Sequence, residues 1–391
     1  MFKKLTLCFW LFLAAVLGNA NSFTMPPDYM QKARSGVAAI YNLDFKTAEE
    51  DINYILDKTP NYPIALFGKT MIEWARFEYE FEKSNSAQTK IFEQAIANSL
   101  EGIKSWLQQN EACAQDYLAL GGIYGVKARF DLANRKYIKA YFAGKKGIKY
   151  MNKAAKLAPE MSDAYLGEAI YQYYAGTLPA VVKVLAKLVG SANAQKGIDY
   201  LNIIKDKGEF SADTAKLLLV EISIHNDKYY NPKLAAELIA EVRQKYPQNP
   251  LFEFVSIIAD YENKNYEKVI SSAQNFLSKI GKESFYKEIY IARTYSAIGT
   301  SYMAQGLWEK AAKTFEESIL ATQNQEMSRW QMNNLLRLAQ VYDVLGKRDE
   351  ALELYTTIKK AKESWGIDEV ASIYLKRPFS TEDKIGHLSP P

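Results

Sequence analysis

The sequence predicts an all-α protein built from antiparallel helix pairs. One helical hairpin occupies residues 295–318, and the same spacing of residues returns forty positions later, at residues 335–358. Each copy has a small residue in its first segment and another twelve positions later, with bulky apolar residues nearby on the same helical face. This spacing is typical of two helices that cross closely, and a short glycine-containing link makes them antiparallel neighbours.

The residues that define these two repeats occupy matching positions. The first copy contains Gly299, Tyr302, Ala311 and Phe315, and the second contains Ala339, Tyr342, Ala351 and Tyr355. The same spacing predicts a third hairpin at Gly121, Tyr124 and Ala133, with Ala133 already in its second helix. The pattern resembles the tetratricopeptide repeat, whose signature is W-x2-L-G-x2-Y…A-x3-F…P at a period of about 34 residues. The resemblance implies a right-handed superhelix, an α-solenoid, that serves as a binding scaffold.

Composition agrees with an ordered helical protein. Of the 391 residues, 48% are apolar, and Gly (20) and Pro (12) are few. The 27 tyrosines suit helix pairs that use aromatic side chains as spacers. The formal net charge of +4 falls to +2 when Lys3 and Lys4 are subtracted with an N-terminal leader, and this balance by itself implies no polyanionic partner.

Residues 1–20 have the pattern of a secretory signal peptide. Lys3 and Lys4 precede an apolar run from Leu5 to Leu17, and Gly18 and Ala20 are small residues at the cleavage positions. We expect cleavage after Ala20 rather than retention as an anchor, because the run is shorter than the ~20 residues of a spanning helix. The sequence therefore predicts export to a bacterial periplasm or to the medium, and it disfavours a nucleic-acid partner.

The remaining chain is predicted as one helical array over residues 28–375. Helices are expected at residues 64–82, 87–108, 162–174, 211–226, 232–245, 251–263 and 266–280. Residues 175–196 form an irregular insertion that contains the apolar segment 180–189. This interruption resembles a subset of tetratricopeptide proteins that includes the Iml2 / tetratricopeptide repeat protein 39 family. The three prolines of residues 376–391 predict a flexible or extended tail.

A basic stripe is the first candidate surface. Between Val126 and Pro159 there are ten Lys or Arg residues and a single acidic residue, Asp131. In a helix over residues 134–157, the members of the stripe share one face: Arg135, Lys139, Lys146, Lys149, Lys153 and Lys156. Tyr137 is expected on the opposite face. The stripe is either an ordinary solvated face or an anion-receiving surface for an acidic segment, a carboxylate or lipid head groups.

The apolar segment 180–189 is the second candidate surface. Lys183 and Lys187 lie four residues apart on one face, and the remaining surface, including Val184, is aliphatic. Such a segment either packs against neighbouring repeats or lies on a membrane surface.

Few residues suit catalysis. His225 and His387 are the only histidines, 162 residues apart in sequence. A metal site built on histidine ligands, or a nucleophilic triad with a histidine base, therefore has few residues available. Glu73 and nearby glutamates leave carboxylate chemistry of the kind found in helical-toroid glycosidases formally open. Cys113 is the single cysteine after the leader and is predicted to be a small residue at a helix start.

These observations predict a non-enzymatic scaffold outside the cytoplasm, without cofactor or metal, that binds a protein or peptide partner. The alternative is a membrane- or lipid-associated envelope factor that uses residues 180–189 together with the basic stripe.

Overall fold

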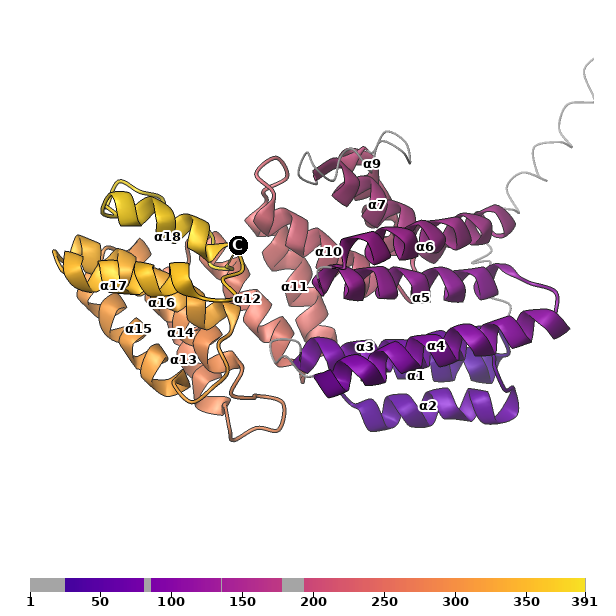
Figure 1. The fold of residues 1–391 in the computed structure, drawn as a ribbon. Coiled ribbons are helices and arrows are strands. Elements are labelled where there is room, and N and C mark those ends of the chain that lie inside the picture. Colours follow the sequence, from indigo (N-terminus) through magenta and orange to yellow (C-terminus); the bar gives the residue numbers. More distant parts are fainter. Residues whose placement is uncertain (1–24, 81–85, 135, 178–192, 391) are drawn as a thin grey trace, which may run out of the picture. The chain divides into compact units, whose positions relative to one another are not determined.

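The computed structural model of the protein describes residues 25–80, 86–134, 136–177 and 193–390. All regular secondary structure within these residues is helical, which confirms the all-α prediction (Figure 1). The described chain divides into two compact units. Unit 1 takes residues 25–36, 49–70 and 94–212, and unit 2 takes residues 37–48, 71–93 and 213–390.

The helices in chain order are α1 (Pro27–Tyr41), α2 (Phe45–Lys58), α3 (Pro63–Glu80), α4 (Ser86–Gln109), α5 (Ala114–Ala133), α6 (Tyr137–Leu157), η1 (Ser162–Tyr165), α7 (Leu166–Thr177), α9 (Ala194–Lys207), α10 (Ala212–His225), α11 (Pro232–Lys245), α12 (Pro250–Glu262), α13 (Tyr266–Lys279), α14 (Tyr290–Ala304), α15 (Trp308–Thr322), α16 (Arg329–Val344), α17 (Arg348–Lys360) and α18 (Ile367–Lys376). Successive helices pack in pairs, among them α5 with α6, α14 with α15 and α16 with α17. Six of the seven helices predicted by residue range agree with these bounds to within two residues. The exception is the range 162–174, which the structure divides into η1 and α7, with α7 ending three residues later at Thr177.

Helix starts in unit 2 follow from local sequence. The side chain of Asn231 accepts a hydrogen bond from the Leu234 N–H, and Pro232 opens α11. Asn249 and Pro250 repeat this arrangement at the start of α12. Asparagine caps an N-terminus well, and proline in the first turn has no N–H to leave unpaired. The two Asn-Pro pairs therefore place the starts of α11 and α12.

The two sharp repeats in unit 2 are built as the sequence predicts. Gly306 and Gly346 adopt φ of +71° and +74° in the links between paired helices. Gly299 packs against Phe315 so closely that a Cβ atom would lie 2.6 Å from the ring. Ala311, Phe315, Ala339, Ala351 and Tyr355 are fully buried in the core of these repeats. Tyr302 and Tyr342 pack against this core as half-buried side chains.

The predicted register of the α5–α6 hairpin in unit 1 is wrong. Ala133 ends the first helix rather than starting the second. Next to it, the Asn134 side-chain amide donates to the Phe130 carbonyl at 2.8 Å, a local contact of the kind that favours a helix end. The close approach is made instead by Gly121 and Gly147. A Cβ atom on Gly147 would lie 3.2 Å from the backbone oxygen of Gly121. Both helices are consequently longer than in the sharp repeats, with 20 and 21 residues against 13 to 16.

The segment after α18 differs from the flexible tail that the sequence predicts. Its backbone is extended, but Phe379 and Leu388 are buried in unit 2, at 2% and 0% exposure. The Phe379 N–H donates to Asp343 at 2.8 Å, and the Leu388 N–H donates to Glu262 at 3.2 Å. Because these contacts join residues far apart in sequence, periodicity within the tail cannot reveal them.

Some predicted features lie outside the described residues. These are the leader, residues 1–20, most of the insertion with Lys183, Val184 and Lys187, and Arg135 of the basic stripe. Among the helices that are described, none has both the length and the apolar composition needed to cross a bilayer.

Candidate functional site

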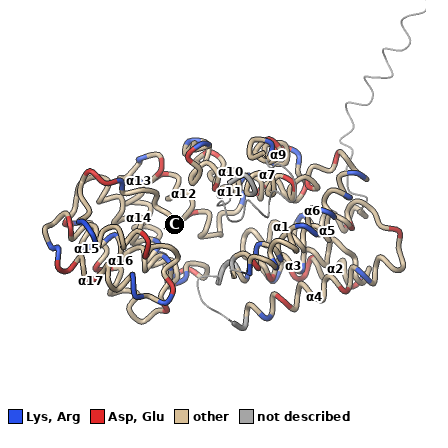
Figure 2. The backbone as a smooth tube through the Cα atoms, turned by 45° about the horizontal axis from the view of Figure 1, so that its top comes forward, with Lys and Arg blue, Asp and Glu red and all other residues tan. Residues whose placement is uncertain are grey.

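The exposed face of α6 in unit 1 carries the described part of the basic stripe. Its five described lysines are Lys139, Lys146, Lys149, Lys153 and Lys156, and all are exposed. Figure 2 shows Lys and Arg residues, in blue, along this helix. Asp131, the single acidic residue of the segment, already accepts an ion pair from Lys127 at 2.8 Å. Among the described residues, no carboxylate lies within 4 Å of any of the five lysines.

Three tyrosines stack beside these lysines. The Tyr150 ring of α6 lies between Tyr117 and Tyr124 of α5, at centroid distances of 6.1 and 5.8 Å and interplanar angles of 16° and 12°. The Lys153 ammonium lies 4.8 Å from the Tyr117 centroid, and the Lys146 ammonium lies 5.3 Å from that of Tyr124. We call these five residues the lysine–tyrosine ladder.

The ladder follows from how α5 and α6 cross. Tyr117 and Tyr124 are seven residues apart, about two helical turns, so both rings stand on one face of α5. The approach of Gly147 to Gly121 brings Tyr150 between them. Each ammonium over a ring gains a cation–π attraction of about 0.5–1 kcal/mol at an exposed site. Lys146 and Lys153 are therefore partly ordered before any ligand arrives.

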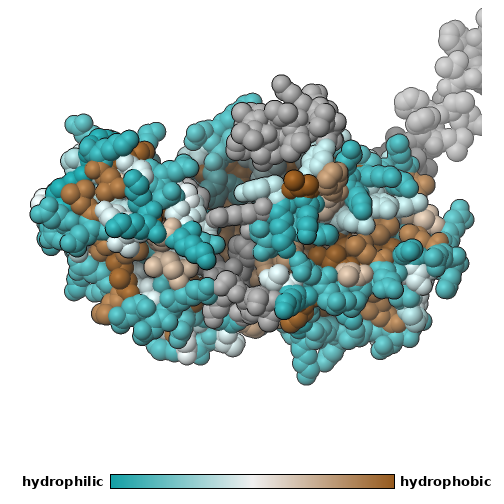
Figure 3. All heavy atoms as spheres, in the orientation of Figure 1, coloured by the Kyte–Doolittle hydropathy of each residue, from teal (hydrophilic) through white to brown (hydrophobic). Residues whose placement is uncertain are grey.

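Apolar side chains are interleaved with the lysines. By the step of about 100° per residue, Ile138, Phe142 and Leu157 fall on or beside the lysine face. They are 71%, 58% and 58% exposed. Tyr137, predicted on the face opposite the lysines, is 60% exposed in the first turn of α6. Figure 3 shows hydrophobic residues, in brown, also gathered over the neighbouring helix α5. The surface thus combines positive charge with aromatic and aliphatic area.

The carboxylate that sequence analysis left open for catalysis is paired. Glu73 on α3 accepts from Arg76 at 2.6 Å and from the Gln88 amide at 3.4 Å. The Glu73 carboxylate thus contacts an arginine one turn away on α3 and an amide of α4. Burial raises the pKa of the Cys113 thiol, at the start of α5, and so lowers its thiolate fraction.

The two histidines are brought together in unit 2. The ring centroids of His225 and His387 lie 6.0 Å apart, although the two residues are 162 positions apart in sequence. His387 pairs with Glu262, and hydrogen bonding to that carboxylate raises the pKa of the imidazole. Within the described residues, no group of three or more His, Cys, Asp or Glu side chains has the geometry to hold a metal ion.

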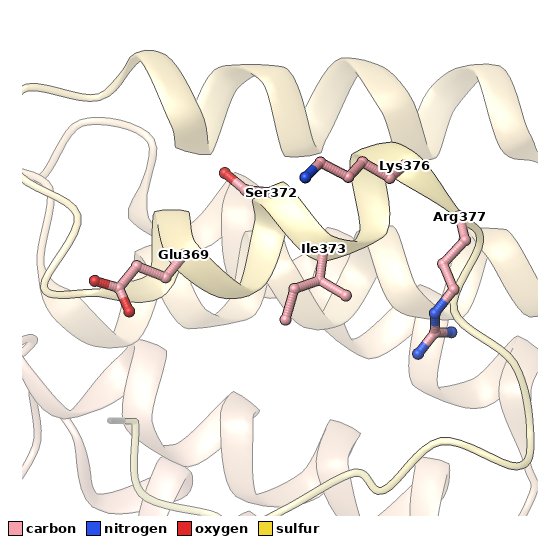
Figure 4. Close-up of a pocket in the computed structure, with 5 residues that line it drawn as sticks. All are labelled: Glu369, Ser372, Ile373, Lys376 and Arg377. Carbon is pink, nitrogen blue, oxygen red and sulfur yellow. The ribbon is translucent and has the colours of Figure 1, made fainter.

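Two surface depressions lie on unit 2. The first, about 520 Å³, runs along α18 and is lined by Glu369, Ser372, Ile373, Lys376 and Arg377 (Figure 4). Its lining stands along one helix, so no side chains converge from opposite sides. The second, about 680 Å³, has an apolar floor that includes Met332, Leu335 and Trp365.

Comparison with known proteins identifies the sharp repeats. Residues 290–364, which span α14 to α17, match the family model described as Tetratricopeptide repeat. This match supports a tetratricopeptide-repeat protein, in agreement with the resemblance drawn from the residues of these two hairpins. No curated protein matches the chain. The narrower resemblance to the Iml2 / tetratricopeptide repeat protein 39 family stays a prediction.

Solved structures with similar helical folds include two complexes. One is NprR with its cognate peptide NprX, at 13% identity and a TM-score of 0.45, covering 90% of this chain and 84% of that chain. The other is the APC/C hetero-tetramer Cut9–Hcn1, at 16% identity and a TM-score of 0.43, covering 85% of this chain and 59% of that chain.

Proposed function

We propose that the protein is a non-enzymatic scaffold outside the cytoplasm that binds an acidic protein or peptide segment on the exposed face of α6. The observation that carries the proposal is the row of five exposed lysines without a carboxylate partner among the described residues. Like charges crowded on one face repel one another, and an acidic ligand relieves that repulsion. The tetratricopeptide match in unit 2 supports a scaffold rather than an enzyme.

The lysine–tyrosine ladder supports a protein ligand over a simple anion. Tyrosine gives contact area with little loss of side-chain entropy, and aromatic residues are enriched at the centres of protein interfaces. Phe142 and Ile138 add exposed apolar area beside the charges. The complementary ligand is a segment in which acidic residues alternate with apolar ones.

Export is part of the proposal and rests on the leader pattern of residues 1–20. Lys3 and Lys4, the apolar run and the small residues before Ala20 support passage through a secretory pathway and cleavage after Ala20. A scaffold in that location would act on envelope or secreted partners.

Charge reversal on α6 tests the binding surface. A variant with Lys146→Glu, Lys149→Glu and Lys153→Glu should bind a short acidic, aromatic-containing peptide at least about tenfold more weakly, a loss of about 1.4 kcal/mol. The difference should shrink as salt is raised, because exposed charges are screened. The measurement is fluorescence anisotropy with the labelled peptide over a range of salt concentrations.

A matched control reverses three exposed lysines elsewhere, Lys207, Lys233 and Lys282. These substitutions change the net charge by the same amount and should leave peptide affinity within about threefold of the unmodified chain. Equal losses in both variants would show that only net charge matters and would remove α6 as the site.

An anionic lipid surface is the second candidate ligand, favoured by the exposure of Ile138, Phe142 and Leu157 among the lysines. Vesicles rich in phosphatidylglycerol separate the two candidates. Co-sedimentation that depends on the α6 lysines, without binding of the acidic peptide, would replace the protein partner with a membrane. Binding of the peptide without co-sedimentation with the vesicles would exclude an anionic lipid surface as the ligand.

A further inference from the structure

The extended segment after α18 is held in unit 2 chiefly through its main chain. Arg337 of α16 donates to the carbonyls of Ile385 and His387, the latter at 3.2 Å. Tyr261 of α12 donates its hydroxyl to the Gly386 carbonyl at 3.3 Å. In both Figure 1 and Figure 2 the mark for this end of the chain lies beside α12. We call Tyr261, Glu262, Arg337 and Gln340 the tail site.

Glu262 completes the tail site on the other side of the segment. One carboxylate oxygen accepts the Leu388 N–H at 3.2 Å, and the other contacts His387 Nδ1 at 3.0 Å and the Tyr230 hydroxyl at 3.1 Å. The Leu388 side chain beyond it is fully buried. The tail site thus binds three carbonyl groups and one N–H of the main chain and buries one aliphatic side chain. An extended peptide presents the same groups.

The chemistry of Arg337 indicates that this site is built for a ligand. Its residue is 7% exposed, and within the described chain no carboxylate lies within 4 Å of its guanidinium. Two of its partners are carbonyls of the tail, and the third is the Gln340 side-chain oxygen at 3.2 Å. A buried cation without acceptors is costly, so the carbonyls of the docked segment contribute to holding Arg337 in the site, and an extended peptide presents the same carbonyl groups.

The tail is anchored at separate points rather than along its whole length. Phe379, Leu388 and Pro390 are buried, whereas Thr381, Glu382, Lys384 and Gly386 are exposed. Gly386 has φ of +83°, a conformation that glycine adopts without strain. A segment attached by few side chains opens at lower cost than a packed helix.

We propose that the tail site is a peptide-binding site, that residues 385–388 are its intramolecular occupant, and that an extended partner segment displaces them. The partner segment that fits has a residue tolerating positive φ, then a residue whose side chain pairs with Glu262, then an aliphatic residue that replaces Leu388. Binding of the partner and docking of the tail exclude each other, so the tail inhibits the site until a competitor arrives.

The test uses a fluorescent peptide with the sequence of residues 381–391 and the full chain. The resident tail competes at an effective concentration of the order of millimolar. The unmodified chain should therefore bind the peptide weakly. Leu388→Asp in the chain removes the resident anchor and should tighten peptide binding by at least about tenfold. Glu382→Gln, an exposed tail position, is the matched control and should bind as the unmodified chain does.

One altered peptide and one further variant of the chain test whether the peptide binds at the tail site. A peptide in which the residue equivalent to Leu388 is Asp should not bind the Leu388→Asp chain. Tyr261→Phe in that chain removes only the hydroxyl that reaches the Gly386 carbonyl, and should weaken peptide binding severalfold.

Equal peptide affinities for the unmodified and Leu388→Asp chains would overturn the proposal, because they would show that the tail and the peptide do not compete for one site. If Leu388→Asp prevents folding, the His387→Ala variant tests the proposal in the same peptide-binding assay. It removes the pair with Glu262, leaves Leu388 in place, and should tighten peptide binding severalfold if the proposal holds. No change with His387→Ala in a folded chain would likewise overturn it.

Discussion

Buried carboxylates hold irregular segments in place at the scale of single residues. Asp163 in unit 1 accepts the backbone N–H groups of Glu209, Phe210 and Ser211 at 2.7 to 2.9 Å. Asp343 in unit 2, with 0% side-chain exposure, accepts from Arg348 at 2.7 Å and from the Tyr355 hydroxyl at 2.9 Å. Each carboxylate receives enough donors to offset its loss of hydration. Asp163 consequently anchors the irregular segment 209–211. Asp343 joins α16 to α17 and, by accepting from the Phe379 N–H at 2.8 Å, to the extended segment after α18.

Asp343→Ala should destabilise the end of unit 2 by about 3 kcal/mol, because it leaves Arg348, Tyr355 and the Phe379 N–H without their acceptor. Hydrogen exchange localised to α16, α17 and α18 measures the loss. Asp349→Ala, at an exposed position in α17, is the control and should change stability by less than about 1 kcal/mol. Similar exchange rates in both variants would contradict the anchoring role of Asp343.

The close packing around Gly299 determines how much a larger residue at that position would destabilise the protein. Gly299→Ala should destabilise the sharp repeats by about 1–3 kcal/mol, because the new methyl group would meet the Phe315 ring. Gly125→Ala in α5 is the control, since nothing lies within 4 Å of a Cβ atom there. It should raise stability by about 0.5–1 kcal/mol through helix propensity. Thermal unfolding of both variants measures the contrast, and a neutral Gly299→Ala would mean that the register of the first repeat is wrong.

At the scale of elements, one repeat pattern produces two kinds of hairpin. The α14–α15 and α16–α17 pairs have glycine links with positive φ and cross at Gly299 or Ala339. The α5–α6 pair ends its first helix at Asn134 and crosses at Gly121 and Gly147. The five described lysines of the basic stripe lie on the exposed face of this longer second helix.

Docking of the tail should depend on pH through His387. The Glu262 carboxylate raises the pKa of this imidazole above its ordinary value, with Asp227 adding to the effect and burial opposing it. Tyr230 and His225 are its other titratable neighbours. A raised pKa in the docked state means that the stabilisation is complete below the ordinary histidine pKa and is lost as pH rises through the raised value.

The tail should therefore release more readily at alkaline than at weakly acidic pH. Uptake of the residue 381–391 peptide by the unmodified chain, measured by anisotropy across this range, should increase with pH. His387→Ala should flatten the profile. An unchanged slope in His387→Ala would assign the pH effect to another group.

At the scale of the whole molecule, the leader pattern predicted for residues 1–20 and the modest net charge bear on the proposed site of action. The charge of +4 includes Lys3 and Lys4, so the mature chain would carry +2, concentrated unevenly toward the stretch from Val126 to Pro159. A nearly balanced protein with one basic face is attracted to acidic ligands locally without binding polyanions in general.

Export is checked by the first residue of the protein recovered from its native host. N-terminal sequencing should give Asn21, the residue after the predicted cleavage position. Recovery of Met1 from a membrane fraction would show instead that the apolar run is kept as an anchor.

The sequence by itself determined the all-α class, most helix bounds and the sharp repeats, because these depend on spacing within about forty residues. It also singled out the lysines of α6, because charges on one helical face can be counted along the chain. The stacking of Tyr150 between Tyr117 and Tyr124 was not predicted, because it depends on where α5 and α6 cross. Only the tertiary structure decided that crossing.

The tail site belongs wholly to tertiary structure. Arg337 and Ile385 are 48 residues apart, and Glu262 and Leu388 are 126 residues apart. Hydrophobic periodicity reports which face of a helix is buried, and a segment without periodicity is therefore predicted to be free. A main chain that is held by distant side chains leaves no such pattern. For that reason the sequence predicted a flexible tail, whereas in the fold Tyr261, Glu262 and Arg337 hold its main chain.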